Sequence, residues 1–215
     1  MGKRITKGLI ADFDNTLVKT QSFIRRHLLH TVRRLKIKPP SGRKLNDILR
    51  KNLPFEQIFN ELFGEKGPKV LESYREDAME TPYEAMAGAV PVVKKFVKNG
   101  NKVVIVSNRA NKLEERLTQA KFDPKWFLAI IQPSHSKPDK RAYDEALKIL
   151  AKEKIDRKNI FVLGDSPDDF IACRKGLRNG FYALTRDLEL SSKFKKAGLT
   201  KTRIISSLKL LPIFK

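Results

Sequence analysis

The chain has 215 residues, 32% of them charged and 40% hydrophobic, and carries a formal net charge of +21. This length suits one α/β domain with a small insertion, and no run of about 18 apolar residues is present to cross a membrane. The single cysteine excludes an intrachain disulfide and fits a reducing cytoplasm. The first apolar segment begins so near the N-terminus that no signal peptide is expected.

The first predicted element is a strand at residues 9–13, and it runs directly into two acids. Asp12 and Asp14 are two residues apart, so both carboxylates point to the same side of the strand end, while Phe13 faces the other side. Two carboxylates held this close repel each other unless a cation lies between them, and oxygen ligands suit Mg²⁺. The alternative at this point is a strand that ends in solvated acids.

Residues 18–84 contain helical patterns and no run that resembles a strand. Apolar residues recur at helical spacing in three groups, separated by turns. These groups are Ile24, Leu28, Val32 and Leu35; Phe55, Ile58, Phe59, Leu62 and Phe63; and Val70, Leu71 and Tyr74. We therefore predict a small all-helical domain at 18–84, inserted into a core formed by 1–17 and 85–215.

The remainder of the chain alternates between strand and helix patterns. Strands are predicted at 103–106, 128–131, 160–163 and 181–184, with an edge strand at 203–205. Helices are predicted at 92–97, 112–120, 141–152 and 169–175, with a closing helix at 207–211. This alternation is typical of a doubly wound parallel sheet with helices on both faces, so the fold class is α/β with a Rossmann-like core.

Polar groups follow the predicted strands at the positions where open α/β sheets bind ligands. Ser107 and Asn108 follow the second strand, Lys137 stands before a proline at a helix start, and Gly164 is followed by a run of acids. Together with the Asp12 segment, and in this order, these motifs resemble the haloacid dehalogenase superfamily of phosphotransferases with an aspartate nucleophile. The resemblance extends over about residues 5 to 190.

The resemblance implies a role for each of these residues. It implies a catalytic set of Asp12 as nucleophile, Asp14 as general acid and base, and Lys137 as a compact positive charge. It implies a Mg²⁺ site formed by Asp12, the backbone carbonyl of Asp14, Asp165 and, through water, Asp169. The residues expected to contact the substrate are Thr16, Ser107, Asn108 and Arg109.

The implied function is a cytoplasmic, Mg²⁺-dependent phosphatase that hydrolyses the phosphate monoester of a small metabolite through an aspartyl-phosphate. In the family, an acid at the Asp14 position separates phosphatases from dehalogenases. A phosphatase for nucleotides or nucleic-acid ends, a mutase or phosphonate-cleaving enzyme, and a nucleic-acid-binding or regulatory protein on this fold are the alternatives. The sequence identifies neither the substrate nor the oligomeric state.

Two basic segments bear on these alternatives. Residues 19–51 contain eleven Lys and Arg against one acid, and residues 191–215 contain seven against none. Such charge attracts polyanions, but no motif of interleaved aromatic residues accompanies it. A solvated basic surface is therefore favoured over a nucleic-acid partner.

Overall fold

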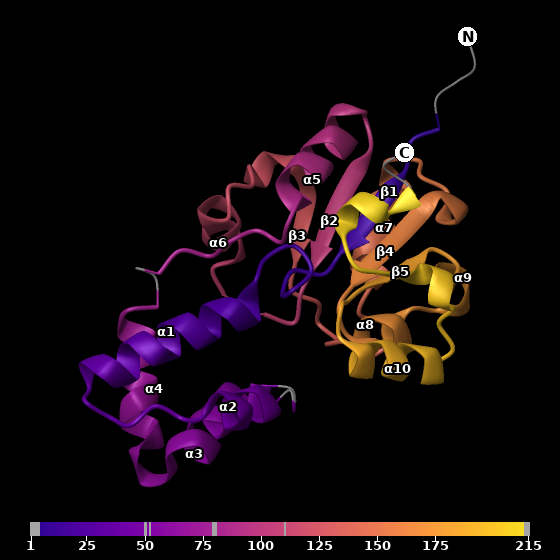
Figure 1. Cartoon of the computed structure of the whole chain (residues 1–215). Coiled ribbons are helices and arrows are strands. Elements are labelled where there is room, and N and C mark those ends of the chain that lie inside the picture. The colour runs from indigo at the N-terminus through magenta and orange to yellow at the C-terminus, as the bar shows by residue number, and fades with distance from the viewer. Residues whose placement is uncertain (1–4, 50, 52, 79–80, 110, 213–215) are drawn as a thin grey trace. The chain divides into compact units, whose positions relative to one another are not determined.

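The computed structural model describes residues 5–212 except 50, 52, 79–80 and 110. The chain divides into two compact units, one formed by Met1–Lys19 and Glu84–Lys215 and the other by Thr20–Tyr83 (Figure 1). Within the described residues, none of the helices combines the length and the apolar character needed to span a bilayer.

The first unit is built on a parallel sheet, which confirms the predicted α/β class. Its strand order is β3-β2-β1-β4-β5-β6 within the described residues. The central strand β1 pairs in parallel with both β2 and β4, so the chain crosses over at β1. The strands are β1 (Gly8–Ala11), β2 (Lys102–Val106), β3 (Phe127–Ile131), β4 (Ile160–Gly164), β5 (Phe181–Leu184) and β6 (Ile204–Ile205).

Helices and short 3₁₀ turns connect these strands. The helices are α5 (Ala89–Lys98), α6 (Leu113–Gln119), α7 (Asp144–Lys152), α8 (Pro167–Ala172), α9 (Lys175–Arg178) and α10 (Leu188–Lys196). The 3₁₀ turns are η2 (Pro124–Trp126), η3 (Arg157–Asn159), η4 (Lys201–Arg203) and η5 (Leu208–Leu210).

Both faces of the sheet are buried. One face packs on residues of α7, α8 and α10 around Ile10, Val162 and Phe181. Because side chains alternate along a strand, Leu9 and Leu163 point to the opposite face, and they too are fully buried. The sheet is therefore covered on both sides, and its free edges are where loops can present polar groups.

Three helix predictions differ from the structure. The helix predicted at 169–175 begins earlier, at Pro167, because the Ser166 side chain caps α8 there. It ends at Ala172. Cys173 lies just after that helix with extended backbone and is buried. The helix predicted at 141–152 begins at Asp144, and the predicted closing helix is the single 3₁₀ turn η5.

The second unit contains helices α1 (Thr20–Arg34), α2 (Gly42–Leu49), α3 (Phe55–Phe63) and α4 (Gly67–Glu76) with the turn η1 (Gly64–Lys66). The buried face of α1 is formed by Phe23, His27, Leu28, Thr31 and Val32. The predicted face is thus shifted toward Phe23, because the Phe23 ring stacks on Tyr83 with centroids 4.0 Å apart.

His27 belongs to the core of the second unit. Its ring nitrogens lie 3.0 Å from Thr81 Oγ1 and 2.8 Å from the carbonyl oxygen of Tyr74. Both polar atoms of the ring are therefore satisfied by this unit's own groups, which is the ordinary situation of a buried histidine.

Candidate active site

A buried lysine joins two acids at the carboxyl edge of the sheet in the first unit. The ammonium of Lys137 donates to Asp12 Oδ1 and to Asp169 Oδ1, at 2.6 Å each. Its third hydrogen bond goes to the carbonyl oxygen of Val106, at 3.0 Å. All three donors of the ammonium are thus used, and Lys137 is fixed between the ends of β1 and β2 and the first turn of α8.

The electrostatics of this cluster follow from burial. Burial raises the pKa of Asp12 to about 7; Lys137 opposes the shift, and the nearby Asp169 and Asp14 carboxylates add to it. Burial, followed by the charge of Asp12, raises the pKa of Asp165 well above its ordinary value. Burial lowers the pKa of Lys137, but the Asp12 and Asp169 carboxylates outweigh burial and raise it. The lysine is therefore charged at neutral pH, whereas Asp12 and Asp165 retain protons to a higher pH than ordinary carboxyl groups do.

The acids form a candidate metal centre. Asp12, Asp165 and Asp169 each offer an oxygen, and these oxygens lie within 4.8 Å of one another. The carboxylate of Asp165 has no hydrogen-bond or ion-pair partner among the residues that the structure describes, although Lys137 occupies the neighbouring acids. A carboxylate left unpaired in a buried acidic cluster is what an oxygen-preferring cation such as Mg²⁺ would satisfy. The residues present therefore fit the expected metal.

Asp169 is held by the start of α8. Its Oδ2 accepts a hydrogen bond from the Ser166 N–H at 3.1 Å, while the Ser166 side chain accepts from the Asp168 N–H at 3.2 Å. The buried Tyr143 hydroxyl donates to the Asp169 carbonyl oxygen at 3.2 Å. This reciprocal cap points the Asp169 carboxylate back toward β4 and Lys137.

Gly164, the last residue of β4, leaves room for that carboxylate. A Cβ at Gly164 would overlap the side chain of Asp169. We expect Gly164→Ala to lower the free energy of unfolding by about 1–3 kcal/mol, the usual cost of overpacking, and to displace Asp169 from Lys137. Urea unfolding measures the loss. Gly176→Ala is the control, because a Cβ there meets no atom within 4 Å; equal losses in the two variants would contradict the close fit.

The side chain of Asn108 is joined to the backbone of Lys137 by two hydrogen bonds. The Asn108 amide donates to the Lys137 carbonyl oxygen at 3.0 Å and accepts from the Lys137 N–H at 2.9 Å. The predicted substrate contact Asn108 is thus occupied in holding Lys137. Beside it, Ser107 is buried, and its hydroxyl oxygen accepts from the Arg109 N–H at 3.2 Å.

Arg109 and Asp14 form an ion pair at the mouth of the site. Arg109 donates from Nη2 to Asp14 Oδ1 at 2.8 Å and from Nε to both carboxylate oxygens at 3.2 and 3.3 Å. The two side chains are 28% and 31% exposed, so they are accessible to a ligand, unlike the Lys137 cluster. The hydroxyl of Thr16 is buried and has no hydrogen-bond partner in the described part of the chain.

Two contributors to this site were not identified from the sequence. Tyr143 belongs to no motif in the sequence. Val106 contributes a backbone carbonyl oxygen, which side-chain patterns cannot predict. The capping role of Ser166 could have been found, because a serine three residues before an acid at a helix start is a capping signal.

Known proteins resemble this chain in sequence and in fold. Residues 9–177 match the family model described as "Haloacid dehalogenase-like hydrolase". A Clostridium perfringens protein assigned as the pyrophosphatase PpaX is 22% identical over 169 residues, which cover 77% of this chain and 78% of that protein.

Solved structures extend the likeness over nearly the whole chain. A Thermotoga maritima protein assigned as a β-phosphoglucomutase has a TM-score of 0.76 at 17% identity, covering 96% of this chain and 97% of its own. CbbY from Rhodobacter sphaeroides, in complex with phosphate, has a TM-score of 0.65 at 16% identity and coverages of 96% and 99%. The HAD hydrolase YfnB from Bacillus subtilis, bound to magnesium, has a TM-score of 0.69 at 16% identity and coverages of 96% and 96%. With the family model matching most of its length, the chain belongs to the haloacid dehalogenase-like hydrolase family, as its motifs predicted.

Proposed function

We propose that this hydrolase is a Mg²⁺-dependent phosphatase that cleaves the phosphate monoester of a small metabolite through an aspartyl-phosphate on Asp12. The observation that carries the proposal is the buried ammonium of Lys137, 2.6 Å from both Asp12 and Asp169, beside the unpaired Asp165. The similarity to CbbY with bound phosphate and to a protein assigned as a pyrophosphatase supports phosphoryl chemistry.

Positive charge is the main requirement of this reaction. Two unit charges about 4 Å apart repel by roughly 4 kcal/mol at an effective dielectric near 20, and a phosphate dianion doubles that. Lys137 provides one fixed positive charge next to Asp12. A bound Mg²⁺ would neutralise further charge on the phosphoryl oxygens. Asp12, Asp165 and the main-chain carbonyl of Asp14 are the groups proposed to hold it, with Asp169 acting through water.

Asp12 and Asp14 would each have a role in the two steps of hydrolysis. An oxygen of Asp12 attacks phosphorus and the ester P–O bond breaks. Asp14, which enters the cycle protonated, gives that proton to the leaving alcohol. Asp14 next takes a proton from water as the water oxygen attacks phosphorus, which releases inorganic phosphate and restores the Asp12 carboxylate. The Ser107 and Thr16 hydroxyls are proposed to bind phosphate oxygens.

Asn108 and Arg109 are proposed to act on the substrate through the residues that they hold. Asn108 holds the backbone of Lys137, and Arg109 holds the carboxylate of Asp14. We also propose that the Thr20–Tyr83 unit, expected as a domain at 18–84, is the cap that selects the substrate. The buried, free Cys173 accords with the proposed cytoplasmic location.

Hydrolysis of p-nitrophenyl phosphate tests the proposal. The purified full chain should release p-nitrophenol when Mg²⁺ is present in excess over the protein. The release should stop when excess EDTA removes the metal. A screen of phosphorylated sugars, phosphorylated hydroxy acids and nucleoside monophosphates would then identify the leaving group. No turnover of any monoester with Mg²⁺ present would overturn the phosphatase assignment.

Mg²⁺ should stabilise the protein more at pH 8 than at pH 5.5. The pKa of Asp12 is raised to about 7 from an ordinary 3.8, so the folded, metal-free chain keeps a proton that the unfolded chain releases. The free energy of unfolding of the metal-free protein therefore falls as pH rises from about 3.8 to about 7. At pH values below about 7, Mg²⁺ competes with the proton on Asp12. At about 100 times its Kd, Mg²⁺ adds about 2.7 kcal/mol, which is roughly 5–11 °C in Tm.

Thermal unfolding with EDTA or Mg²⁺ at the two pH values measures this. The control is Asp12→Asn, which has no titrating group at that position and should lose most of the Mg²⁺-dependent shift. Equal Mg²⁺-dependent shifts at both pH values would contradict a site that includes Asp12.

Asp14→Asn should affect poor leaving groups more than good ones. An alkyl alcohol needs a proton to depart, whereas p-nitrophenolate does not, so the loss in kcat/KM should be about 10²-fold or more for an alkyl phosphate and smaller for p-nitrophenyl phosphate. Steady-state kinetics on both substrates measures the difference. Equal losses would contradict the role of Asp14 as general acid.

A further inference from the structure

Three short turns on one edge of the sheet carry basic residues. The turn η3 before β4 contains Arg157 and Lys158, the helix α9 before β5 contains Lys175 and Arg178, and the turn η4 before β6 contains Lys201 and Arg203. These six residues are called the basic ridge here. In the sequence they are spread over 47 positions between 157 and 203, and only Lys201 and Arg203 belong to the basic segment at 191–215.

The parallel topology brings the three turns together. β4, β5 and β6 are neighbours in the sheet and run in the same direction, so the turns that precede them meet at the amino edge. Neighbouring strands are about 5 Å apart, which sets the order of spacing between the turns. The Arg203 guanidinium donates to the Arg178 carbonyl oxygen at 3.5 Å and lies 5.6 Å from the Tyr182 ring centroid. The ridge is therefore continuous from η4 to α9.

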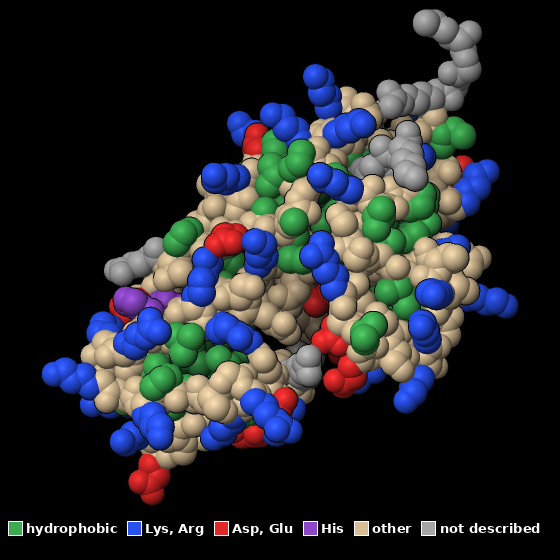
Figure 2. Space-filling view, in the orientation of Figure 1, with side chains coloured by type: hydrophobic (Ala, Val, Ile, Leu, Met, Phe, Trp, Pro, Cys, Tyr) green, Lys and Arg blue, Asp and Glu red, His purple; other side chains and the backbone are tan. Residues whose placement is uncertain are grey.

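Most of the charge on the ridge is uncompensated. Arg157, Lys158, Lys175 and Lys201 are exposed, and none has a side-chain partner among the described residues. Asp156 is the one acid in or next to the three turns, at the start of η3. Figure 2 shows the blue side chains of Lys and Arg over and around α9. An anion with several charges is the chemistry that this edge fits.

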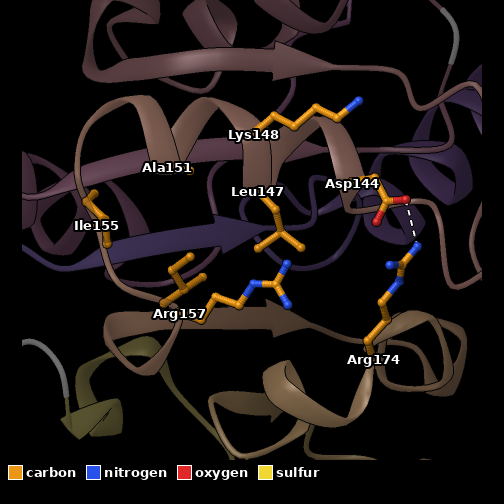
Figure 3. Close-up of a pocket in the computed structure, with 8 residues that line it drawn as sticks. Asp144, Leu147, Lys148, Ala151, Ile155, Arg157 and Arg174 are labelled. Carbon is orange, nitrogen blue, oxygen red and sulfur yellow. Dashed lines mark hydrogen bonds and ion pairs between the residues drawn. The ribbon is translucent and has the colours of Figure 1, made fainter.

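A pocket continues the ridge toward α7. It has a volume of about 300 Å³, with Leu147, Ala151, Ile155 and Ile160 as apolar lining. Figure 3 shows the side chains of Arg157 and Arg174 on either side of it. Arg174 is paired with Asp144 at 2.7 Å, whereas Arg157 has no partner in the part of the chain that the structure describes. The pocket thus joins an apolar floor to a free guanidinium.

We propose that the basic ridge binds the phosphate backbone of a nucleic acid. A row of cations at strand spacing matches a ligand whose negative charges repeat at short intervals, and nucleic-acid backbones are bound in this way by exposed Lys and Arg. The apolar floor beside Arg157 offers a contact for a sugar or base next to a bound phosphate. Because the ridge lies at the amino edge of the strands and Lys137 at the carboxyl edge, the nucleic acid is an anchor and not the substrate.

Fluorescence anisotropy with a labelled 20-nucleotide RNA and a labelled 20-base-pair DNA tests the proposal. The ridge variant is Arg157→Gln, Lys175→Gln and Lys201→Gln, one change in each turn. The control variant is Lys95→Gln, Lys98→Gln and Lys125→Gln, which removes the same net charge from exposed lysines on α5 and η2. Titrations from 50 to 200 mM NaCl, about the range over which backbone contacts weaken, give the affinity and its salt dependence.

The ridge variant should bind at least about tenfold more weakly than the control variant at 100 mM NaCl, on the order of the salt effect for a few phosphate contacts. The slope of log K against log salt should fall in magnitude by about 2 for the RNA and about 3 for the duplex. The charge-conserving variant Arg157→Lys, Lys175→Arg and Lys201→Arg should bind as the wild type does.

Three results would overturn the proposal. They are no binding by the wild type at about 100 mM NaCl, equal weakening in the ridge and control variants, and no binding by the charge-conserving variant. Hydrolysis of p-nitrophenyl phosphate by the ridge variant should equal that of the wild type. The binding result is therefore independent of whether the proposed phosphatase function holds.

Discussion

Replacing Lys137 with methionine is expected to destabilise the metal-free protein by about 3–5 kcal/mol at pH 8, the usual cost of removing one partner of a buried ion pair. The side chains of Lys137, Asp12 and Asp169 are 5%, 9% and 2% exposed, so water cannot replace the lost ammonium. Roughly 2–4 °C of Tm per kcal/mol predicts a drop of about 6 °C or more. Turnover should be lost as well, because Asp12 would face the phosphate without its positive neighbour.

The pH dependence of that loss separates electrostatics from packing. The charge of Lys137 opposes the raised pKa of Asp12, so without the lysine Asp12 gains a proton more readily. The destabilisation should therefore shrink at pH 5.5. Lys140→Met is the control, since Lys140 is exposed and should change the free energy of unfolding by less than about 0.5 kcal/mol. A Lys137→Met protein as stable as the wild type at pH 8 would contradict the structure of the site.

Asp12→Asn is expected to lower kcat for p-nitrophenyl phosphate by at least about 10⁴-fold, the order seen when a nucleophile is removed. The asparagine fits the same space but offers no carboxylate oxygen to form an acyl phosphate. Acid-quenched wild-type enzyme should retain label from a phosphorus-labelled monoester, and Asp12→Asn should retain none.

The neighbouring acid Asp168 provides the matched control. It lies in the first turn of α8 beside the site, and Lys137 contacts Asp169 instead. Asp168→Asn should therefore keep kcat within about threefold, which is under about 1 kcal/mol of the barrier, because it removes no contact of Lys137. If the Asp12→Asn protein retained the label, the nucleophile would have to be another residue.

Much of the fold was predictable because the sheet is buried on both faces. Strands in such a sheet are short apolar runs bounded by turns, and the predicted strands at 103–106, 128–131, 160–163 and 181–184 each correspond to an observed one. Helix boundaries were harder to place, because a cap such as Ser166 or a turn such as 139–143 moves a helix start without changing the apolar pattern.

That Asp12, Lys137 and Asp169 lie close together in space was predictable only from the order of the motifs along the chain. Their side chains are separated by up to 157 residues, and the order of motifs along the strands is what places them at one edge. The pairing of Arg109 with Asp14 and of Asn108 with Lys137 was not predictable, since loop conformations decide it. The sequence showed only the Lys201 and Arg203 part of the basic ridge, within the basic segment at 191–215. The other four residues come from separate segments that the parallel strands bring together.

The reciprocal pair between Asn108 and the backbone of Lys137 ties the loop after β2 to the loop after β3. Neither loop can move alone without exposing an unsatisfied amide. Amide protons in both loops should therefore exchange with solvent in a single opening event. Insertions in the turn between α6 and η2 lie outside β2 and β3, so they should leave this junction intact.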